Sequence, residues 1–299
     1  MGKNRLRYED TIKSDEVEEW IAKIFLRPVA FRIVVLLYET KIHSVHVTLA
    51  FLLTGIVAAW LITSGAYPAL FTAALLIQAK SILDAVDGQL ARARNAPSRV
   101  GRFFDSAADF VTSLALIMAT AFLLYERTGE SAYIYTGLAV FLLSGLQNSF
   151  WVYYNVYYRN IISGSGCGIL QESRSEVVYP YDEDKKGILA FLRAFYRLAY
   201  GWQDIIIALL DGISLKIAGV REKDKRSWYG NVGFLRACGP LGLGSHLLAM
   251  SMALVLNRPS YYFVFTIYVA SAYMIILLLY HVVSFTFAGR DHDVSYNGH

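Results

Sequence analysis

The sequence predicts an all-α, polytopic membrane protein with six transmembrane helices and an N-terminal interfacial amphipathic helix. Composition is the first reason: 56% of the 299 residues are hydrophobic, 14% are aromatic, only 17% are charged, and the mean hydropathy is +0.40. A soluble domain carries about 25% charged residues. The second reason is that the apolar residues form runs too long for core helices. The third is the uneven distribution of Lys and Arg between the links that join these runs.

Residues 1–44 are expected to form a cytoplasmic N-terminal segment that lies on the membrane surface. Apolar and charged side chains near its middle fall on opposite faces of one helix. The apolar face holds Val17, Trp20, Ile21, Ile24 and Phe25, and the charged face holds Asp15, Glu16, Glu18, Glu19 and Lys23. Pro28 is expected to interrupt this helix. The apolar run that follows, residues 29–38, is too short to cross a bilayer.

Six later stretches are long and apolar enough to span a membrane, which takes about 20 residues in a helix. They are residues 45–64, 68–88, 101–125, 132–158, 232–256 and 260–288. The second and third are the least hydrophobic of the six because acidic residues lie at their facing ends. Residues 45–288 are therefore predicted to form one six-helix membrane domain, followed by a cytoplasmic tail at residues 289–299.

The basic residues predict how these helices are oriented. The links that join the first to the second span, the third to the fourth and the fifth to the sixth contain only Arg127 and Arg258. Nearly all other Lys and Arg residues fall on the opposite side, which the positive-inside rule makes cytoplasmic. The sequence thus predicts a multi-pass protein of the cell membrane whose acidic residues face the cytoplasm.

Residues 159–231 form a long cytoplasmic insertion within the membrane domain. It opens with the glycine-rich sequence SGSGCG, which is not a nucleotide-binding loop because no Gly-Lys-Ser/Thr follows. Residues 187–219 have a helical pattern and are expected to form a surface helix or a short re-entrant element. A seventh span is the alternative, but Asp204 and Asp211 argue against it.

Eight positions where the second and third spans meet form the pattern DxxDGxxAR(x8)GxxxDxxxD. They are Asp84, Asp87, Gly88, Ala91, Arg92, Gly101, Asp105 and Asp109. A charge near the centre of a membrane helix costs roughly 2.5 to 3.5 kcal/mol, so four carboxylates need a compensating positive charge. At helical spacing the first two acids share one face and the last two share another. Oxygen ligands without Cys or His favour Mg²⁺ or Mn²⁺, and four carboxylates can hold two such ions.

The other positions of the pattern predict a phosphate ligand beside these ions. Gly88, Ala91 and Gly101 remove side-chain bulk, so that a flat ligand can approach the backbone. Arg92 can donate two hydrogen bonds to a phosphate. Close helix packing is the alternative role of small residues in membrane helices, but their combination with the acids favours a ligand site.

The complete pattern resembles the signature of the CDP-alcohol phosphotransferase (CDP-alcohol phosphatidyltransferase) family. The resemblance implies a six-helix core over residues 45–288, a homodimer, and displacement of CMP from a CDP-linked donor by an alcohol. It makes Asp84, Asp87, Asp105 and Asp109 metal ligands, Asp109 also the general base, and Gly88, Ala91, Arg92 and Gly101 the cytidine diphosphate site. Members often have Pro-Asn ahead of a Thr at the start of the first span. This chain has Val45, His46, Val47 and Thr48, so only the Thr is kept.

Further residues near the pattern have two possible roles. Arg94, Arg99, Arg102 and Arg236 either anchor the cytoplasmic ends of the helices or hold an acidic acceptor or lipid headgroup. Arg236 lies just inside the fifth span and is the candidate for a phosphate contact. Gly239, Pro240, Gly242 and Gly244 are expected to kink or thin the fifth span.

The sequence thus favours a membrane enzyme of phospholipid biosynthesis that moves a substituted phosphate, such as phosphatidyl, from a CDP-linked donor to an acceptor alcohol. One alternative is an aspartate-rich, Mg²⁺-dependent prenyltransferase, which explains DxxD but not the spacing of Arg92 and Gly101. The other is a divalent-cation transporter, which would place acids along a path through the membrane.

Overall fold

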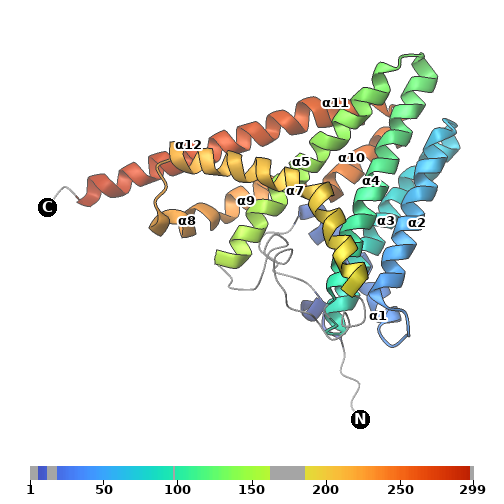
Figure 1. Ribbon diagram of the computed structural model, residues 1–299, viewed down its shortest axis with the longest axis horizontal. Coiled ribbons are helices and arrows are strands. Elements are labelled where there is room, and N and C mark those ends of the chain that lie inside the picture. Colours follow the sequence, from blue (N-terminus) through green and yellow to red (C-terminus); the bar gives the residue numbers. More distant parts are fainter. Residues whose placement is uncertain (1–5, 12–18, 97, 162–185, 297–299) are drawn as a thin grey trace, which may run out of the picture.

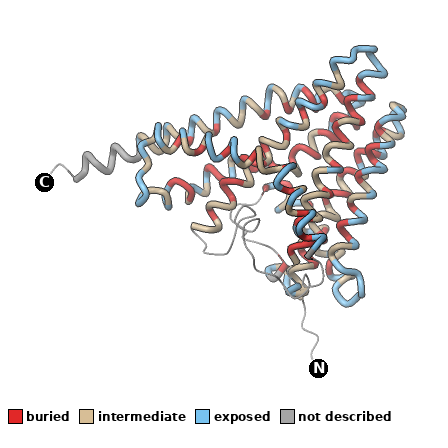
Figure 2. Tube along the Cα trace, viewed as in Figure 1, coloured by how far each residue is buried: buried red, intermediate tan, exposed pale blue. Residues whose placement is uncertain are grey.

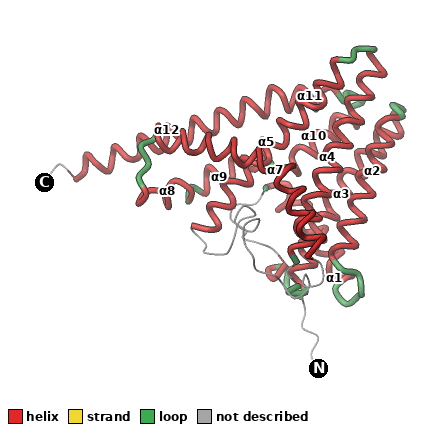
Figure 3. The backbone as a smooth tube through the Cα atoms, in the orientation of Figure 1, coloured by secondary structure: helices red, strands yellow, loops and turns green. Residues whose placement is uncertain are grey.

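The computed structural model describes residues 6–11, 19–96, 98–161 and 186–296, and regular structure in these residues is helical throughout (Figure 3). The α-helices are α1 (Arg27–Leu37), α2 (Ser44–Thr63), α3 (Tyr67–Ala93), α4 (Arg99–Thr128), α5 (Ala132–Ile161), α7 (Lys186–Ile217), α8 (Lys225–Tyr229), α9 (Val232–Cys238), α10 (Leu243–Val255), α11 (Ser260–Val264) and α12 (Ser271–Tyr296). Short 3-10 turns are η1 (Glu9–Thr11), η4 (Glu222–Asp224) and η5 (Gly239–Leu241), and π-helical turns are η2 (Ala22–Leu26) and η6 (Phe265–Ala270).

Helices α2, α3 and α4 pack as a bundle at the right of Figure 1, with α10 against α3 and α5 against α4. Ile62, Ile77, Leu116 and Leu254 are fully buried between these helices. Buried residues concentrate where the helices pack together, and exposed residues lie mainly on the outside (Figure 2). Large apolar side chains such as Trp60 are among the exposed residues. An apolar exterior of this kind is suited to contact with lipid rather than with water.

Hydrogen bonds bring the three short links between helices together at one end of the bundle. Arg127 Nη2 donates to the Gly65 carbonyl oxygen at 3.1 Å and to Asn257 Oδ1 at 2.9 Å. We call this end of the bundle, which contains the links at residues 64–66, 129–131 and 256–259, the hairpin end. The other end, where α3 ends and α4 begins, is called the motif end. The predicted grouping of these three links on one side of the membrane agrees with this arrangement.

The predicted fold class is confirmed, because the described residues contain six helices long and apolar enough to cross a membrane. The set differs from the prediction in one member. It includes α7, and it does not include α5, which was predicted as the fourth span. α5 has 30 residues, but Gln147, Asn148 and several tyrosines in its second half lower its hydropathy.

The contacts of α7 place its two ends beside different helices. Near its start, Leu189 clusters with Phe103 at the beginning of α4. Near its end, Asp211 Oδ1 accepts a hydrogen bond from Tyr154 Oη, in the last third of α5, at 2.9 Å. α7 is longer than expected and is one of the six helices that could cross a membrane. The surface or re-entrant position expected for residues 187–219 stays a prediction. Residues 162–185 of the insertion, including SGSGCG, lie outside the described residues.

The N-terminal helix corrects the prediction that Pro28 interrupts it. Helical structure runs from Trp20 through η2 and α1 to Leu37. Proline removes one backbone donor and its ring crowds the preceding turn. The wider π-helical turn of η2 immediately before Pro28 relieves that crowding. Trp20, Ile24 and Phe25 are exposed, as an interfacial helix requires, whereas Val17 lies outside the described residues.

Glu19 is a second correction, because it was predicted on the charged outer face and is buried. Its Oε1 accepts hydrogen bonds from the Ser245 backbone N at 2.5 Å and from Ser245 Oγ at 2.7 Å. A methyl group on Gly242 would lie 2.8 Å from Glu19 Oε2, and one on Gly244 would lie 2.9 Å from it. The glycines that break the predicted fifth span into α9, η5 and α10 therefore also make room for this carboxylate.

Replacing Glu19 by Gln is expected to flatten the pH dependence of stability. Burial raises the pKa of Glu19 above its ordinary value of 4.5, so the folded protein keeps a proton that the unfolded chain loses. The free energy of unfolding of the wild type should then fall as pH rises through that raised pKa. Gln stays neutral, so the variant should gain stability relative to the wild type as pH rises from 4.5 to the raised pKa of Glu19. Denaturant unfolding followed by tryptophan fluorescence measures this, with the exposed Glu130→Gln as the control that should follow the wild type.

Candidate active site

The predicted acidic cluster forms at the motif end of α3 and α4. One carboxylate oxygen each from Asp84, Asp105 and Asp109 lie within 4.8 Å of one another. Asp105 Oδ1 is buried and has no hydrogen-bond partner among the described residues. A buried oxygen without a partner is costly, and a divalent cation bound by hard oxygen ligands would satisfy it. These three acids could therefore hold a metal ion.

Asp87 lies outside this group of three and is held by a different contact. Its Oδ2 accepts a hydrogen bond from Thr48 Oγ1 on α2 at 2.6 Å, and both side chains are buried. Thr48 is the single residue retained from the Pro-Asn-x-Thr sequence typical of the resembled family. The hydrogen bond from Thr48 orients Asp87, the remaining acid of the eight-position pattern.

A cavity of about 480 Å³ opens beside the acids. Its lining comprises Ser44, Thr48, Asp87, Gly88, Ala91, Arg92, Asn95, Ala96, Ser98, Gly101, Arg102 and Asp105. The lining thus brings together all four positions predicted to bind a cytidine diphosphate: Gly88, Ala91, Arg92 and Gly101. We call it the first cavity. Its volume falls within the range of small-molecule sites, about 300 to 1,000 Å³.

Two features shape the wall of the first cavity. Ser98 caps α4, its Oγ accepting a hydrogen bond from the Gly101 backbone N at 2.9 Å, so the start of α4 faces the cavity. Arg92 lies over Gly88, where an added methyl group would be 3.3 Å from Arg92 Nη1. Arg92 Nε donates to the Thr11 carbonyl oxygen of η1 at 2.6 Å. The N-terminal turn η1 therefore holds Arg92 at the cavity wall.

Comparison with known proteins agrees with this geometry. Residues 41–164 match the family model described as CDP-alcohol phosphatidyltransferase. The chain thus contains a segment that is similar to the CDP-alcohol phosphatidyltransferase family. The family resemblance predicted from the eight-position pattern is confirmed over residues 41–164, and this family is a family of transferases. No curated protein matches the chain.

The matched segment contains α2 to α5 and therefore all four acids. The helices from α7 to α12 lie beyond it. The extent of the membrane domain over residues 45–288 stays a prediction. The part of the chain outside the match is where features particular to this protein are expected.

Lys80 is a site residue that the sequence analysis missed. It lies on α3 one turn before Asp84, is fully buried, and forms an ion pair with Asp109 Oδ1. Its Nζ also lies 4.8 Å from the centre of the Phe51 ring. The signal was present, because a lysine within an apolar span is a candidate functional residue. Lys80 supplies part of the positive charge that four membrane carboxylates require.

The arginines near the domain have different surroundings. Arg94 donates hydrogen bonds to the carbonyl oxygens of Leu37, Tyr38, Thr40 and Ile42, so it fastens the end of α1 to the end of α3. Arg99 is buried at the start of α4. Arg102 lines the first cavity. Arg236 is exposed on α9 and lines neither this cavity nor the one described next.

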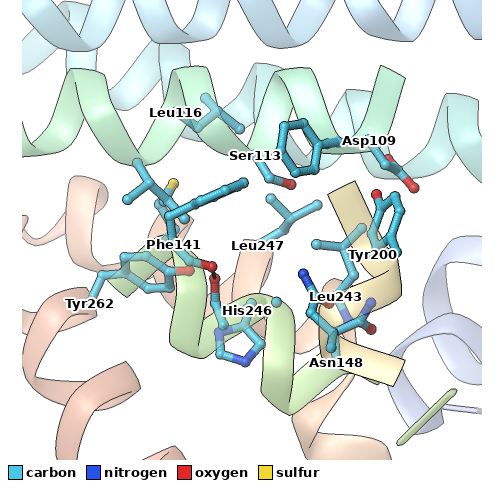
Figure 4. A pocket seen from close by; sticks show the side chains of 16 residues that line it. Asp109, Ser113, Leu116, Phe141, Asn148, Tyr200, Leu243, His246, Leu247 and Tyr262 are labelled. Atoms are coloured by element: carbon cyan, nitrogen blue, oxygen red, sulfur yellow. Dashed lines mark hydrogen bonds between the residues drawn. The ribbon is translucent and has the colours of Figure 1, made fainter. Parts of the chain in front are cut away.

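A second cavity, of about 70 Å³, begins at Asp109 and lies between α4, α5, α7, α10 and α11 (Figure 4). The two cavities share no lining residue, and among the residues that the structure describes, Asp109 is the one acid in the lining of the second cavity. Tyr200 and Gln203 of α7 form one of its walls. Because α7 was expected at the membrane surface, the sequence did not predict this second cavity.

Proposed function

We propose that the protein transfers a substituted phosphate, such as a phosphatidyl group, from a CDP-linked lipid to the hydroxyl of an acceptor alcohol and releases CMP, as a step of phospholipid biosynthesis. The observation that carries the proposal is the first cavity, in which Gly88, Ala91, Arg92 and Gly101 lie together beside the acidic cluster. The family match supports the reaction class.

In the proposed reaction the cytidine diphosphate occupies the first cavity, with Arg92 donating to its phosphate oxygens. Asp84, Asp87, Asp105 and Asp109 would hold Mg²⁺ or Mn²⁺, two ions in all, and charge on the diphosphate would be neutralised by this bound metal. The orphaned oxygen of Asp105 and the absence of Cys and His from the cluster support hard cations.

Asp109 takes the proton of the acceptor hydroxyl in this proposal. The hydroxyl oxygen forms a bond to the phosphorus that carries the lipid, and the bond from that phosphorus to the bridging oxygen of CMP breaks. Lys80 holds Asp109 Oδ1, which leaves Oδ2 to accept the proton. A carboxylate is a weak base toward an alcohol, so positioning and electrostatics must provide most of the rate.

The proposed setting is the cell membrane, with the motif end facing the cytoplasm because the basic residues gather there. The motif end also holds the α3–α4 link, which contains Arg94. The homodimer implied by the family resemblance stays a prediction. Protease accessibility of the α3–α4 link in sealed vesicles of known orientation would test the proposed side.

CMP release tests the proposed function. Purified protein in lipid nanodiscs would receive CDP-diacylglycerol or other CDP-alcohols with a panel of hydroxyl acceptors, with Mg²⁺, with Mn²⁺ or with chelator. We expect release that depends on both metal and acceptor and that free cytidine diphosphate inhibits. A prenyltransferase would instead consume a prenyl diphosphate without inhibition by cytidine diphosphate. A transporter would move cations into liposomes without releasing CMP.

Replacing Arg92 by Ala is expected to weaken binding of cytidine diphosphate roughly 10- to 100-fold, because a hydrogen bond to a charged group contributes about 1.5 to 3 kcal/mol. Arg92→Lys should recover part of this affinity, since Lys keeps the charge but not the paired donors. Calorimetric titration with cytidine diphosphate measures the effect. Arg94→Ala is the matched control: it removes contacts to α1 and should lower stability while leaving the affinity for cytidine diphosphate unchanged.

A further inference from the structure

We infer that the second cavity receives the acceptor, and that the acceptor is an uncharged alcohol whose hydroxyl-bearing end is flanked by apolar groups. This inference rests on the proposed function and names the acceptor class for the same site. It differs from the expectation that an acidic acceptor binds among the arginines near the motif.

Position is the first argument. Asp87 and Asp105 line the first cavity, whereas Asp109 lines the second. In phosphoryl transfer the attacking and leaving oxygens lie roughly in line on opposite sides of the phosphorus. With CMP leaving into the first cavity, the attacking hydroxyl must come from the opposite side of the acidic cluster. The second cavity begins at Asp109, one helical turn beyond Asp105 in the lining of the first, so it adjoins the acidic cluster, with Asp109 at its boundary as the proposed base.

Charge is the second argument. The described residues that line the second cavity include no Lys and no Arg, and Lys80, the nearest cation to Asp109, is already paired with it. A phosphate or carboxylate on the acceptor would enter a buried space next to the Asp109 carboxylate, with no Lys or Arg in the lining to compensate its charge. Burying an unpaired charge in this way is strongly unfavourable. The lining therefore selects against anionic acceptors.

The wall of the cavity supplies the third argument. Phe141, Leu247 and Met250 form an apolar surface between the helices, and Figure 4 shows Asp109 and Tyr200 on one side of the lining and Tyr262 on the opposite side. His246 is 2% exposed, and both of its ring nitrogens lack a hydrogen-bond partner among the described residues. Buried polar atoms are normally satisfied. A second polar atom of a bound alcohol, deeper than the reacting hydroxyl, would satisfy this imidazole.

Size limits the ligand further. A water molecule needs about 10 to 15 Å³ of space in which its centre can lie. The second cavity offers about 70 Å³ of such space, which accommodates about five water-sized groups. The space fits a short alcohol or the hydroxyl-bearing end of a longer one. Tyr200 and Gln203 come from α7, outside the matched segment, so acceptor choice depends on a part of the chain that the family match does not cover.

Ser113→Leu tests the assignment by filling the cavity one helical turn beyond Asp109. The matched control is Thr72→Leu, which adds apolar bulk at an exposed position of α3 that lines neither cavity. In nanodiscs with CDP-diacylglycerol and Mg²⁺, CMP release would be measured with 1-octanol and 1,2-hexanediol as uncharged acceptors and with glycerol 3-phosphate as the anionic one. We expect release with the uncharged alcohols and a tenfold or greater rise in their KM in Ser113→Leu, with Thr72→Leu unchanged.

A photoreactive diazirine analogue of hexanol gives a readout that does not depend on turnover. We expect light-induced labelling of peptides from α4 and α10, suppressed by excess 1-octanol and by Ser113→Leu. Labelling confined to the first cavity or to the lipid-facing surface would overturn the inference, as would CMP release with glycerol 3-phosphate alone. The latter result would leave the proposed phosphotransfer intact. Loss of cytidine diphosphate binding and of CMP release with every acceptor would contradict the proposed function and the acceptor site together.

Discussion

Asp109→Asn is expected to lower turnover by about 10²- to 10⁴-fold, the usual contribution of a positioned acid or base, while cytidine diphosphate still binds. The amide cannot accept the proton of the acceptor hydroxyl, but the first cavity is not lined by Asp109. CMP release and calorimetric titration with cytidine diphosphate measure the two quantities on the same preparation. Substantial turnover in the variant would remove Asp109 from the role of base.

A second variant separates chemistry from folding in this experiment. Asp109→Asn leaves the buried Lys80 ammonium without its ion-pair partner, and breaking a buried pair from one side costs about 3 to 5 kcal/mol. The double variant Lys80→Met/Asp109→Asn removes both charges. We expect it to unfold at higher denaturant than Asp109→Asn alone and to remain inactive. Recovery of turnover in the double variant would show that the single variant fails for structural reasons.

Lys80→Met is expected to make the folded protein depend on divalent metal. Without the ammonium, Asp109 joins Asp84 and Asp105 as an uncompensated carboxylate in a group whose oxygens lie within 4.8 Å of one another. In chelator, the free energy of unfolding should fall by about 3 to 5 kcal/mol. A cation that binds only the folded form stabilises it by mass action. The acidic cluster of Lys80→Met is more negative than that of the wild type and should bind Mn²⁺ more strongly. Added Mn²⁺ should therefore restore much of the lost free energy of unfolding.

Denaturant unfolding with chelator and with Mn²⁺ measures this dependence. Lys216→Met, at an exposed position of α7, is the matched control and should respond to Mn²⁺ as the wild type does. An equal stabilisation of Lys80→Met and the wild type by Mn²⁺ would contradict a charge-compensating role for Lys80.

The acidic site could be predicted from the sequence because its information is local. Four acids at helical spacing on adjoining spans must face each other wherever the two helices meet. The same spacing places Gly88, Ala91 and Gly101 beside them, and the first cavity brings these residues together. Helical periodicity and hydropathy likewise predicted the fold class, since both depend on neighbouring residues.

The features that the sequence did not predict depend on contacts between distant segments. Lys80 forms its ion pair with Asp109 on the next helix. Glu19 accepts its hydrogen bonds from Ser245, which is 226 positions away. Hydropathy ranks α7 above α5 as a span, and the sequence did not predict that Asp211 of α7 accepts a hydrogen bond from Tyr154 of α5. The second cavity requires helices from both halves of the chain, so no local pattern contains it.

Transfer of the phosphorus atom itself is the most direct test of the central claim. The donor would be CDP-diacylglycerol carrying radioactive phosphorus only in the phosphate attached to the lipid, incubated with protein, Mg²⁺ and an accepted alcohol. We predict that the label appears in a new phosphodiester of the lipid and the alcohol, in equal amount to unlabelled CMP, and that chelator prevents both. Label that leaves with the nucleotide, or that appears in phosphatidic acid whether or not an alcohol is present, would contradict phosphotransfer to an alcohol.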